Sequence, residues 1–333
     1  MTATHVAAPT RGAQPQHFDH LGMFYHDAGQ YVAGVTAFVR SAVVAGQPVL
    51  VVVPGRNLEL LRRSIGADAD RVQFADMAVV GRNPGRIIPS LLSAFATTHR
   101  GRRPAIVGEP IWPERTAMEY PACVAHEALI NAVFADHDGA ILCPYDAARL
   151  NATALADAAR THPVLSDGER TWRSDWYGEP VTTAAVANVP LPAPPGDAAV
   201  LTFRDRHDLT AVRRFLAEQA TAAGLPEEQL GDLVVAVNEL AANTVEHAAG
   251  AGRLAVWQED GVLVCQVDDS GQLTDPLAGY VLPPADAHRG RGLVLVNQLC
   301  DLTRRHTRPD GTSIRVQMRR PADRPVSSAD YRS

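Results

Sequence analysis

The first half of the chain alternates short apolar runs with helical ones, and this alternation constrains the fold more than any other feature. Strand-like runs such as 48–53 and 139–146 are separated by helical runs such as 120–135. Such an order is typical of a mostly parallel sheet with crossover helices. We therefore predict an α/β domain over residues 17–165.

The second half follows a different pattern. Residues 166–198 are Pro-rich towards their end and are predicted to be an interdomain linker. Beyond them come two helices, two alternating strands joined by Asp260-Gly261, an irregular stretch, a helix and a closing strand. This order predicts an α+β domain over 199–321, in which helices cover an antiparallel sheet.

Composition narrows the classes of function. The 333 residues carry a net charge of −6, which disfavours direct binding to nucleic acid. No apolar run reaches the ~18 residues of a membrane helix and no signal-peptide core is present, so we expect a cytoplasmic protein with no membrane contact. The ends, 1–16 and 322–333, are predicted to be disordered.

The cysteines are widely scattered and form no C-x-x-C pair. They therefore indicate neither a zinc site nor a disulfide framework. Their apolar surroundings favour buried structural thiols. The four positions are Cys123, Cys143, Cys265 and Cys300.

A polar row on one predicted helix is the first candidate site. Glu239, Asn243 and His247 are spaced i, i+4, i+8 and therefore share one helix face. An Asn amide oxygen is a hard ligand for Mg²⁺, and a carboxylate one turn earlier can activate a hydroxyl for attack on a phosphate. An ordinary solvated helix face has the same pattern. Glu127 and Asn131 repeat this spacing, yet no matching motifs follow them.

Further motifs follow the second helix in order. Asp269 ends a strand, where its carboxylate can accept the adenine amino hydrogen, and Gly271 lets the backbone approach the ring. Gly290 and Gly292 open a helix whose free N–H groups can receive phosphate oxygens. Two arginines add charge there, and a hydroxyl beginning the last strand can reinforce the adenine pocket: Arg289, Arg291 and Thr312. Each motif alone is weak, but chance matching of all of them in order is improbable.

The segments 239–247, 269–271 and 289–293 resemble the N, G1 and G2 boxes of GHKL ATPases. Among these they are most similar to the RsbW/SpoIIAB-type anti-sigma-factor serine kinases. The resemblance covers residues 199–321 and implies a Bergerat fold that binds ATP with Mg²⁺. It also implies a lid over the nucleotide at 273–289.

The resemblance implies a role for each matching residue. Asn243 would help to hold Mg²⁺, Glu239 would act as catalytic base or orient the nucleophile, and Asp269 would bind adenine. The remaining residues of the implied ATP site are His247, Gly271, Arg289, Gly290, Arg291, Gly292, Leu293 and Thr312. The implied partners are a STAS anti-anti-sigma protein, a sigma factor or both, and proteins of this family commonly dimerise.

One departure from the family pattern separates binding from catalysis. Leu273 occupies the position where the G1 box often has a second glycine, and the lid is rich in proline. ATP binding therefore follows more directly than phosphotransfer to a serine. A non-enzymatic ATP-dependent binding switch is an alternative. An atypical sensor histidine kinase is another, although no phosphoacceptor-histidine helix pair is evident upstream.

The first domain has no phosphate loop after its strand at 48–53. Across about 17–165 it resembles the MEDS sensory domain, a family similar to RecA-like ATPases that lost this loop. The resemblance implies the sensing of a small organic molecule. Pockets of open α/β sheets form at strand ends, although Pro and Gly there are also ordinary loop features. The candidate lining residues are Glu109, Trp112, Tyr145 and Asp146.

A histidine-rich segment, HFDHLGMFYHD, begins this domain. Its candidate ligands have mixed spacing: His17, His20, Tyr25 and His26. We favour structural or surface roles for them, with metal binding as the alternative.

Overall fold

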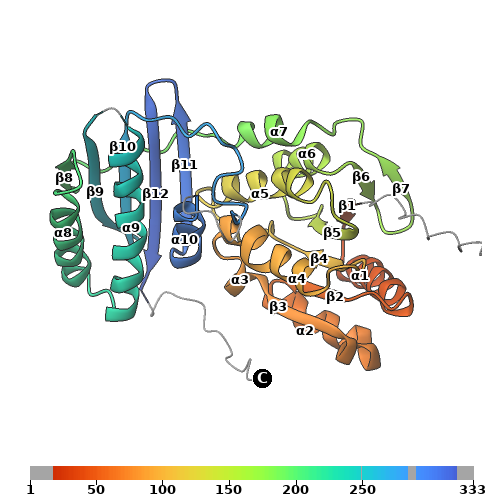
Figure 1. The fold of residues 1–333 in the computed structure, drawn as a ribbon. Coiled ribbons are helices and arrows are strands. Elements are labelled where there is room, and N and C mark those ends of the chain that lie inside the picture. The colour runs from red at the N-terminus through yellow and green to blue at the C-terminus, as the bar shows by residue number, and fades with distance from the viewer. Residues whose placement is uncertain (1–17, 249, 284–289, 321–333) are drawn as a thin grey trace, which may run out of the picture.

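The computed structural model describes residues 18–248, 250–283 and 290–320, arranged as two sheets with their helices (Figure 1). The predicted tails 1–16 and 322–333 lie outside the described residues. None of the helices that the structure describes has the length and apolar content needed to span a bilayer.

Within the described residues, the N-terminal sheet has seven strands in the order β3-β2-β4-β5-β1-β6-β7. All neighbouring pairs are parallel except β6 and β7, so the predicted mostly parallel sheet is confirmed. The strands are β1 (Phe18–Tyr25), β2 (Val49–Val53), β3 (Val72–Asp76), β4 (Ala105–Gly108), β5 (Gly139–Asp146), β6 (Val164–Ser166) and β7 (Thr171–Arg173).

Helices cover both faces of this sheet. One apolar cluster joins α1 (Ala28–Val44) and α2 (Gly55–Ile65) to one face. A second cluster fills the opposite face, because β-strand side chains alternate between faces. Its helices are α3 (Met77–Val80), a π-helical segment (Ile87–Leu92), α4 (Ser93–Thr98), α5 (Tyr120–Val133) and α6 (Ala152–Thr161).

The C-terminal sheet is antiparallel, with the order β11-β12-β10-β9-β8. Asp260 and Gly261 have φ of 47° and 78°, which is the positive-φ pair that a tight hairpin turn requires. The strands are β8 (Ala199–Phe203), β9 (Gly252–Glu259), β10 (Val262–Asp269), β11 (Leu302–Arg308) and β12 (Gly311–Arg319).

One apolar cluster fills the space between this sheet and its helices, so the predicted helix-covered antiparallel layer is confirmed. The helices are α8 (Leu209–Ala222), α9 (Glu227–His247) and α10 (Gly292–Leu299). Two strands of the sheet, β8 and β11, were not among the predicted elements. The stretch 166–198, predicted as linker, carries β7 and the helix α7 (Pro180–Val186), which packs near α5.

The N-terminal domain contacts α10 directly. The side chain of Asn83, fully buried, donates hydrogen bonds to the carbonyl oxygens of Asn297 and Cys300 at 2.9 and 3.2 Å. It also donates to Thr303 Oγ1 at 3.1 Å. Carbonyl groups at a helix C-terminus lack partners within the helix, so a residue of the other domain satisfies those of α10. Nearby, Arg82 forms an ion pair with the buried carboxylate of Asp301 at 2.5 Å.

The residue that joins both domains to the lid is Asn297. Its Nδ2 donates to the carbonyl of Gly85 in the N-terminal domain at 3.3 Å and to that of Gly279 in the lid at 3.0 Å. A Cβ on Gly85 would lie 2.7 Å from the Asn297 side chain, so only glycine permits this approach. The ring of Tyr280 is part of the N-terminal apolar cluster. The described part of the lid is therefore held against the N-terminal domain.

Candidate functional site

A cavity opens in the C-terminal domain between α9, the end of β10 and the start of α10. Eight of the sequence-predicted ATP-site residues line it together: Asn243, His247, Asp269, Gly271, Gly290, Gly292, Leu293 and Thr312. Arg289 lies outside the described residues, and Glu239 and Arg291 are not among the lining residues.

The adenine-binding candidate, Asp269, is fixed by its neighbours. Its Oδ2 accepts a hydrogen bond from Thr244 Oγ1 at 2.7 Å, and its Oδ1 accepts one from the Gly271 N–H at 2.8 Å. Thr312 lies opposite Asp269 on β12 and donates to the Gly271 carbonyl at 2.8 Å. These bonds hold the carboxylate and the turn after it in one orientation, which suits a residue that must match a base edge.

The close approach of this turn to the next strand explains why residue 311 is a glycine. Gly311 has φ of 156°, and a Cβ there would lie 2.1 Å from the Asp269 carbonyl oxygen. The two strand ends can therefore approach each other only because this position has no side chain.

The helix row predicted from sequence faces the start of α10. A Cβ placed on Gly292 would lie 2.9 Å from Glu239 Oε2 and 3.4 Å from Asn243 Nδ2. Both side chains therefore reach the helix N-terminus, where the free N–H groups and the helix dipole favour anions. The opposite side of α9 carries buried apolar residues that hold the row in this position: Leu233, Val237, Leu240 and Ala241.

A second cavity lies between the two domains, next to the first. Its wall includes Gly85 and Ala122 of the N-terminal domain and Thr303 of the C-terminal domain. Four residues line both cavities: Leu273, Ala278, Leu293 and Ile314. Leu273, the departure from the G1 glycine pattern, thus forms part of the partition between the domain interface and the nucleotide cavity.

The four residues predicted to line a sensory pocket form two pairs, Glu109 with Asp146 and Trp112 with Tyr145. Glu109, at the end of β4, is fully buried and accepts hydrogen bonds from Tyr31 Oη at 3.1 Å and from Asn57 Nδ2 at 2.9 Å. Burial raises the pKa of the Glu109 carboxyl to about 7, with the nearby Asp146 adding to the shift and Asn57 opposing it. Glu109 and Asp146 therefore share one environment.

The other two candidates both pack in the second apolar cluster. Trp112 stacks against the Arg115 guanidinium, whose Cζ is 4.0 Å from the ring centroid. Tyr145 points into the second apolar cluster, where its ring lies 5.5 Å from that of His162. Tyr145 and Asp146 are successive residues of one strand, so their side chains project to opposite faces of the sheet.

One cluster of chemically reactive residues escaped the sequence analysis. His20 meets three residues that were not singled out as ligands: Glu127, Cys143 and His162. The repeated Glu127–Asn131 spacing belongs to this cluster rather than to a nucleotide site. No spacing signal could reveal the cluster, because its members come from separate elements.

The raised pKa of Glu109 predicts a pH-dependent stability. Below about pH 4.5 this carboxyl is protonated in both states, whereas between pH 4.5 and 7 only the unfolded chain ionises, so native stability falls as pH rises. Relative to wild type, Glu109→Gln should gain about 3 kcal/mol of unfolding free energy across that window. Urea titrations at a series of pH values measure this. The exposed carboxylate variant Glu59→Gln is the control, and curves for Glu109→Gln and wild type that stay parallel would contradict the prediction.

Comparison with known proteins agrees with this geometry. Residues 19–163 match the model of the methanogen/methylotroph, DcmR sensory domain (MEDS), and residues 203–318 match that of the histidine kinase-like ATPase domain. No curated protein matches the chain. The chain is similar to the RsbU and RsbW domains of Rv1364c from Mycobacterium tuberculosis, with 21% identity and a TM-score of 0.28 over 36% of this chain and 32% of that one.

The chain spans about a third of the length of this Rv1364c structure. A second similar solved structure is the histidine kinase AdeS of Acinetobacter baumannii, with 9% identity and a TM-score of 0.23 over 60% of this chain and 95% of that one. The antiparallel sheet with helices on one face is consistent with the GHKL fold. The chain joins a MEDS sensory domain to a histidine kinase-like ATPase domain of GHKL type.

Proposed function

We propose that this chain is an anti-sigma-type regulator whose C-terminal domain binds ATP with Mg²⁺ and phosphorylates a serine of a STAS anti-anti-sigma protein. The same C-terminal domain would also bind a sigma factor. The N-terminal domain controls this activity in response to a small molecule. The main support is the gathering of the three sequence boxes around one cavity, with Asp269 fixed on both carboxylate oxygens.

The site fits the nucleotide and the metal in chemical terms. Asn243 would supply an amide oxygen to Mg²⁺, and Gly290 and Gly292 would let phosphate oxygens approach the N-terminus of α10. Glu239 reaches the same helix start, where a carboxylate can orient or deprotonate an attacking serine hydroxyl. Bound Mg²⁺ would neutralise charge on the phosphates during transfer.

The interface between the domains supplies a route for control. The Asn297 side chain bonds to both Gly85 and the lid residue Gly279, and it lies on the helix whose first residues line the nucleotide cavity. A ligand that changes the packing of the N-terminal domain would therefore change the position of α10 and the lid together. Such a ligand shifts the equilibrium only by the difference in its affinity for the two arrangements.

A second candidate function is an ATP-dependent binding switch without phosphotransfer. Leu273 supports it, because this side chain lines both the nucleotide cavity and the interdomain cavity. A residue in that position can transmit nucleotide occupancy to the interface without any chemical step. Phosphotransfer assays separate the two functions.

Nucleotide binding is tested by isothermal titration of the full chain with ATP and Mg²⁺. Asn243→Ala should weaken binding about tenfold or more, equivalent to about 1.4 kcal/mol, because a metal ligand is lost. Asn238→Ala is the matched control on the same helix, since Asn238 bonds to Arg213 and does not line the cavity. A wild-type chain that binds no ATP would remove the basis of both candidate functions.

Phosphotransfer is tested with radiolabelled ATP and the STAS-domain proteins of the source organism. The wild-type chain should label one of them with an acid-stable phosphate, and Glu239→Gln should reduce the rate by about two orders of magnitude or more. Glu228→Gln, which alters an exposed residue in the first turn of α9, should leave the rate unchanged. ATP binding without any labelled partner favours the binding switch, whereas acid-labile labelling of the chain itself favours a histidine kinase.

A further inference from the structure

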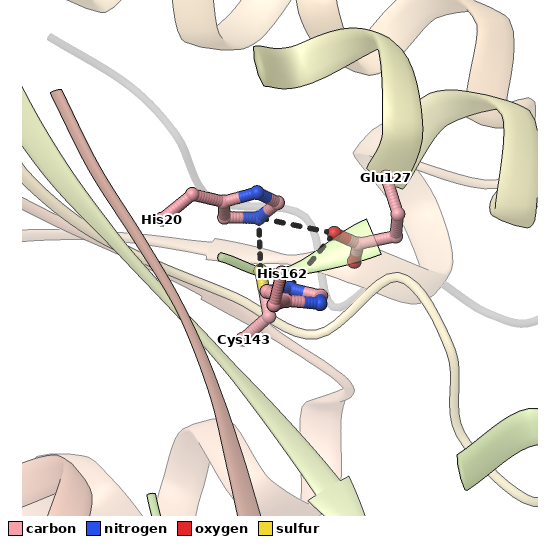
Figure 2. Close-up of side chains that lie close together, drawn as sticks. All are labelled: His20, Glu127, Cys143 and His162. Carbon is pink, nitrogen blue, oxygen red and sulfur yellow. Dashed lines mark hydrogen bonds and ion pairs between the residues drawn. The ribbon is translucent and has the colours of Figure 1, made fainter. Parts of the chain in front are cut away.

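Four buried side chains meet inside the N-terminal domain (Figure 2). His20 comes from β1, Glu127 from α5, Cys143 from β5, and His162 follows the last residue of α6. Each offers one ligand atom, and these atoms all lie within 4.8 Å of one another. Each of the four residues is at most 1% exposed. Ionisable side chains that are fully buried in a protein core are normally paired with an opposite charge or coordinate a metal ion.

The sheet is built to bring these residues together. Gly22 pairs with Cys143 in the register of β1 and β5, and Gly22 lies two residues after His20, so all three positions share one face of the sheet. A Cβ on Gly22 would lie 3.1 Å from Cγ of His162. The absence of a side chain there makes room for the His162 ring.

Both imidazole rings are oriented from outside the cluster. Nδ1 of His162 lies 2.8 Å from the Ala158 carbonyl oxygen, which can only accept, so this nitrogen carries the proton. Nδ1 of His20 lies 3.1 Å from Asn131 Oδ1, and the amide of Asn131 donates to the Thr161 carbonyl at 2.8 Å, which leaves Oδ1 as the acceptor. In each neutral ring the lone pair on Nε2 therefore faces the other members. This arrangement of outer hydrogen bonds is the one that metal-binding histidines use.

The inner atoms lack the donors that they need. The Cys143 thiol lies 3.4 Å from His20 Nε2 and can donate to it. Among the described residues, both oxygens of Glu127 and Nε2 of His162 are buried without a hydrogen bond, and Glu127 Oε2 has only ion-pair contacts, with Nε2 of His20 and of His162. A buried carboxylate that faces imidazole lone pairs is unfavourable unless a cation lies between them.

The distances match the coordination shell of a small cation. Glu127 Oε2 lies 3.2 Å from His20 Nε2 and 3.4 Å from His162 Nε2, and Cys143 Sγ lies 3.4 Å from His20 Nε2. Bonds of about 2.0–2.3 Å around a tetrahedral zinc ion give ligand–ligand distances of about 3.3–3.6 Å. The remaining pairs need to contract by about 1.5 Å at most, which side-chain rotation can provide.

We propose that His20, Glu127, Cys143 and His162 form a closed, tetrahedral binding site for one zinc-type transition metal ion. On binding, the Cys143 thiol releases its proton to solvent and the sulfur bonds to the metal as a thiolate. Thiolate and carboxylate together supply two negative charges that balance a divalent ion in a buried site. Because all four ligands come from the protein, the ion connects β1, β5, α5 and the end of α6.

The wild-type full chain tests this directly. Purified without chelator, it should contain about one zinc ion per chain by elemental analysis. After removal of the metal, addition of Co²⁺ should give the visible absorption of a tetrahedral site together with a thiolate charge-transfer band. Metal removal should also lower the melting temperature, because the ion binds only the folded chain.

Variants assign the site. Cys143→Ser should abolish the charge-transfer band, and His162→Gln should reduce metal content to a small fraction of one ion per chain. Cys123→Ser is the matched control, because Cys123 is an equally buried free thiol of the same domain outside the cluster. It should keep both the band and the metal. These measurements do not depend on nucleotide binding, so a negative result would rule out the metal site without affecting the proposed function.

Two results would overturn the proposal. One is a folded wild-type chain that contains no transition metal and shows no Co²⁺ spectrum after stoichiometric addition. The other is metal binding that survives in a folded Cys143→Ser chain with its charge-transfer band intact.

Discussion

The side chain of Asn83, in the N-terminal domain, caps the C-terminal end of α10, which belongs to the C-terminal domain. The side-chain NH2 group of Asn83 lies within hydrogen-bond distance of three acceptors, two at the C-terminal end of α10 and one at the start of β11. The N-terminal end of the same helix lines the nucleotide cavity. Because a helix of eight residues moves as a rigid unit, the position of the end that lines the cavity depends on a contact made by the N-terminal domain.

The position of the lid also depends on contacts with its neighbours, including the N-terminal domain. Arg305 donates to the carbonyl oxygens of Pro276 and Ala278 at 2.8 and 3.0 Å, and Asn297 donates to that of Gly279. Tyr280 then inserts its ring into the apolar cluster of the N-terminal domain. The lid sequence is rich in proline. In the structure, the described part of the lid is held mainly by contacts with β11, α10 and the sensory domain.

Sequence patterns predicted elements best where local and tertiary preferences agree. The strand 139–146 was predicted residue for residue, because an apolar run follows a glycine turn. β11 was not predicted, because its sequence LTRRHTR is strongly basic. Its Arg304 is buried and donates to the Met118 carbonyl of the N-terminal domain, so the partner domain rather than the local sequence explains the strand. α7 was hidden by the prolines around it, and it forms because it packs against α5.

The nucleotide cavity and the cluster around Glu127 also differ in how far the sequence predicts them. The nucleotide boxes lie on consecutive elements in a fixed order, so linear spacing identified most of their lining residues. The cluster around Glu127 joins four elements that only the sheet order brings together. His20 was weighed as a ligand, but the partners that would decide the question are distant in sequence. Position in the fold, not spacing, carries that information.

We propose that α10 couples the sensory domain to the nucleotide cavity, and hydrogen–deuterium exchange of the intact chain measures this coupling. Saturating ATP with Mg²⁺ should slow amide exchange around Asp269 and Gly292. It should also slow exchange in residues 82–90 of the N-terminal domain, which contact α10 and line no part of the nucleotide cavity. Protection confined to the C-terminal domain, with exchange in 82–90 unchanged, would contradict the account.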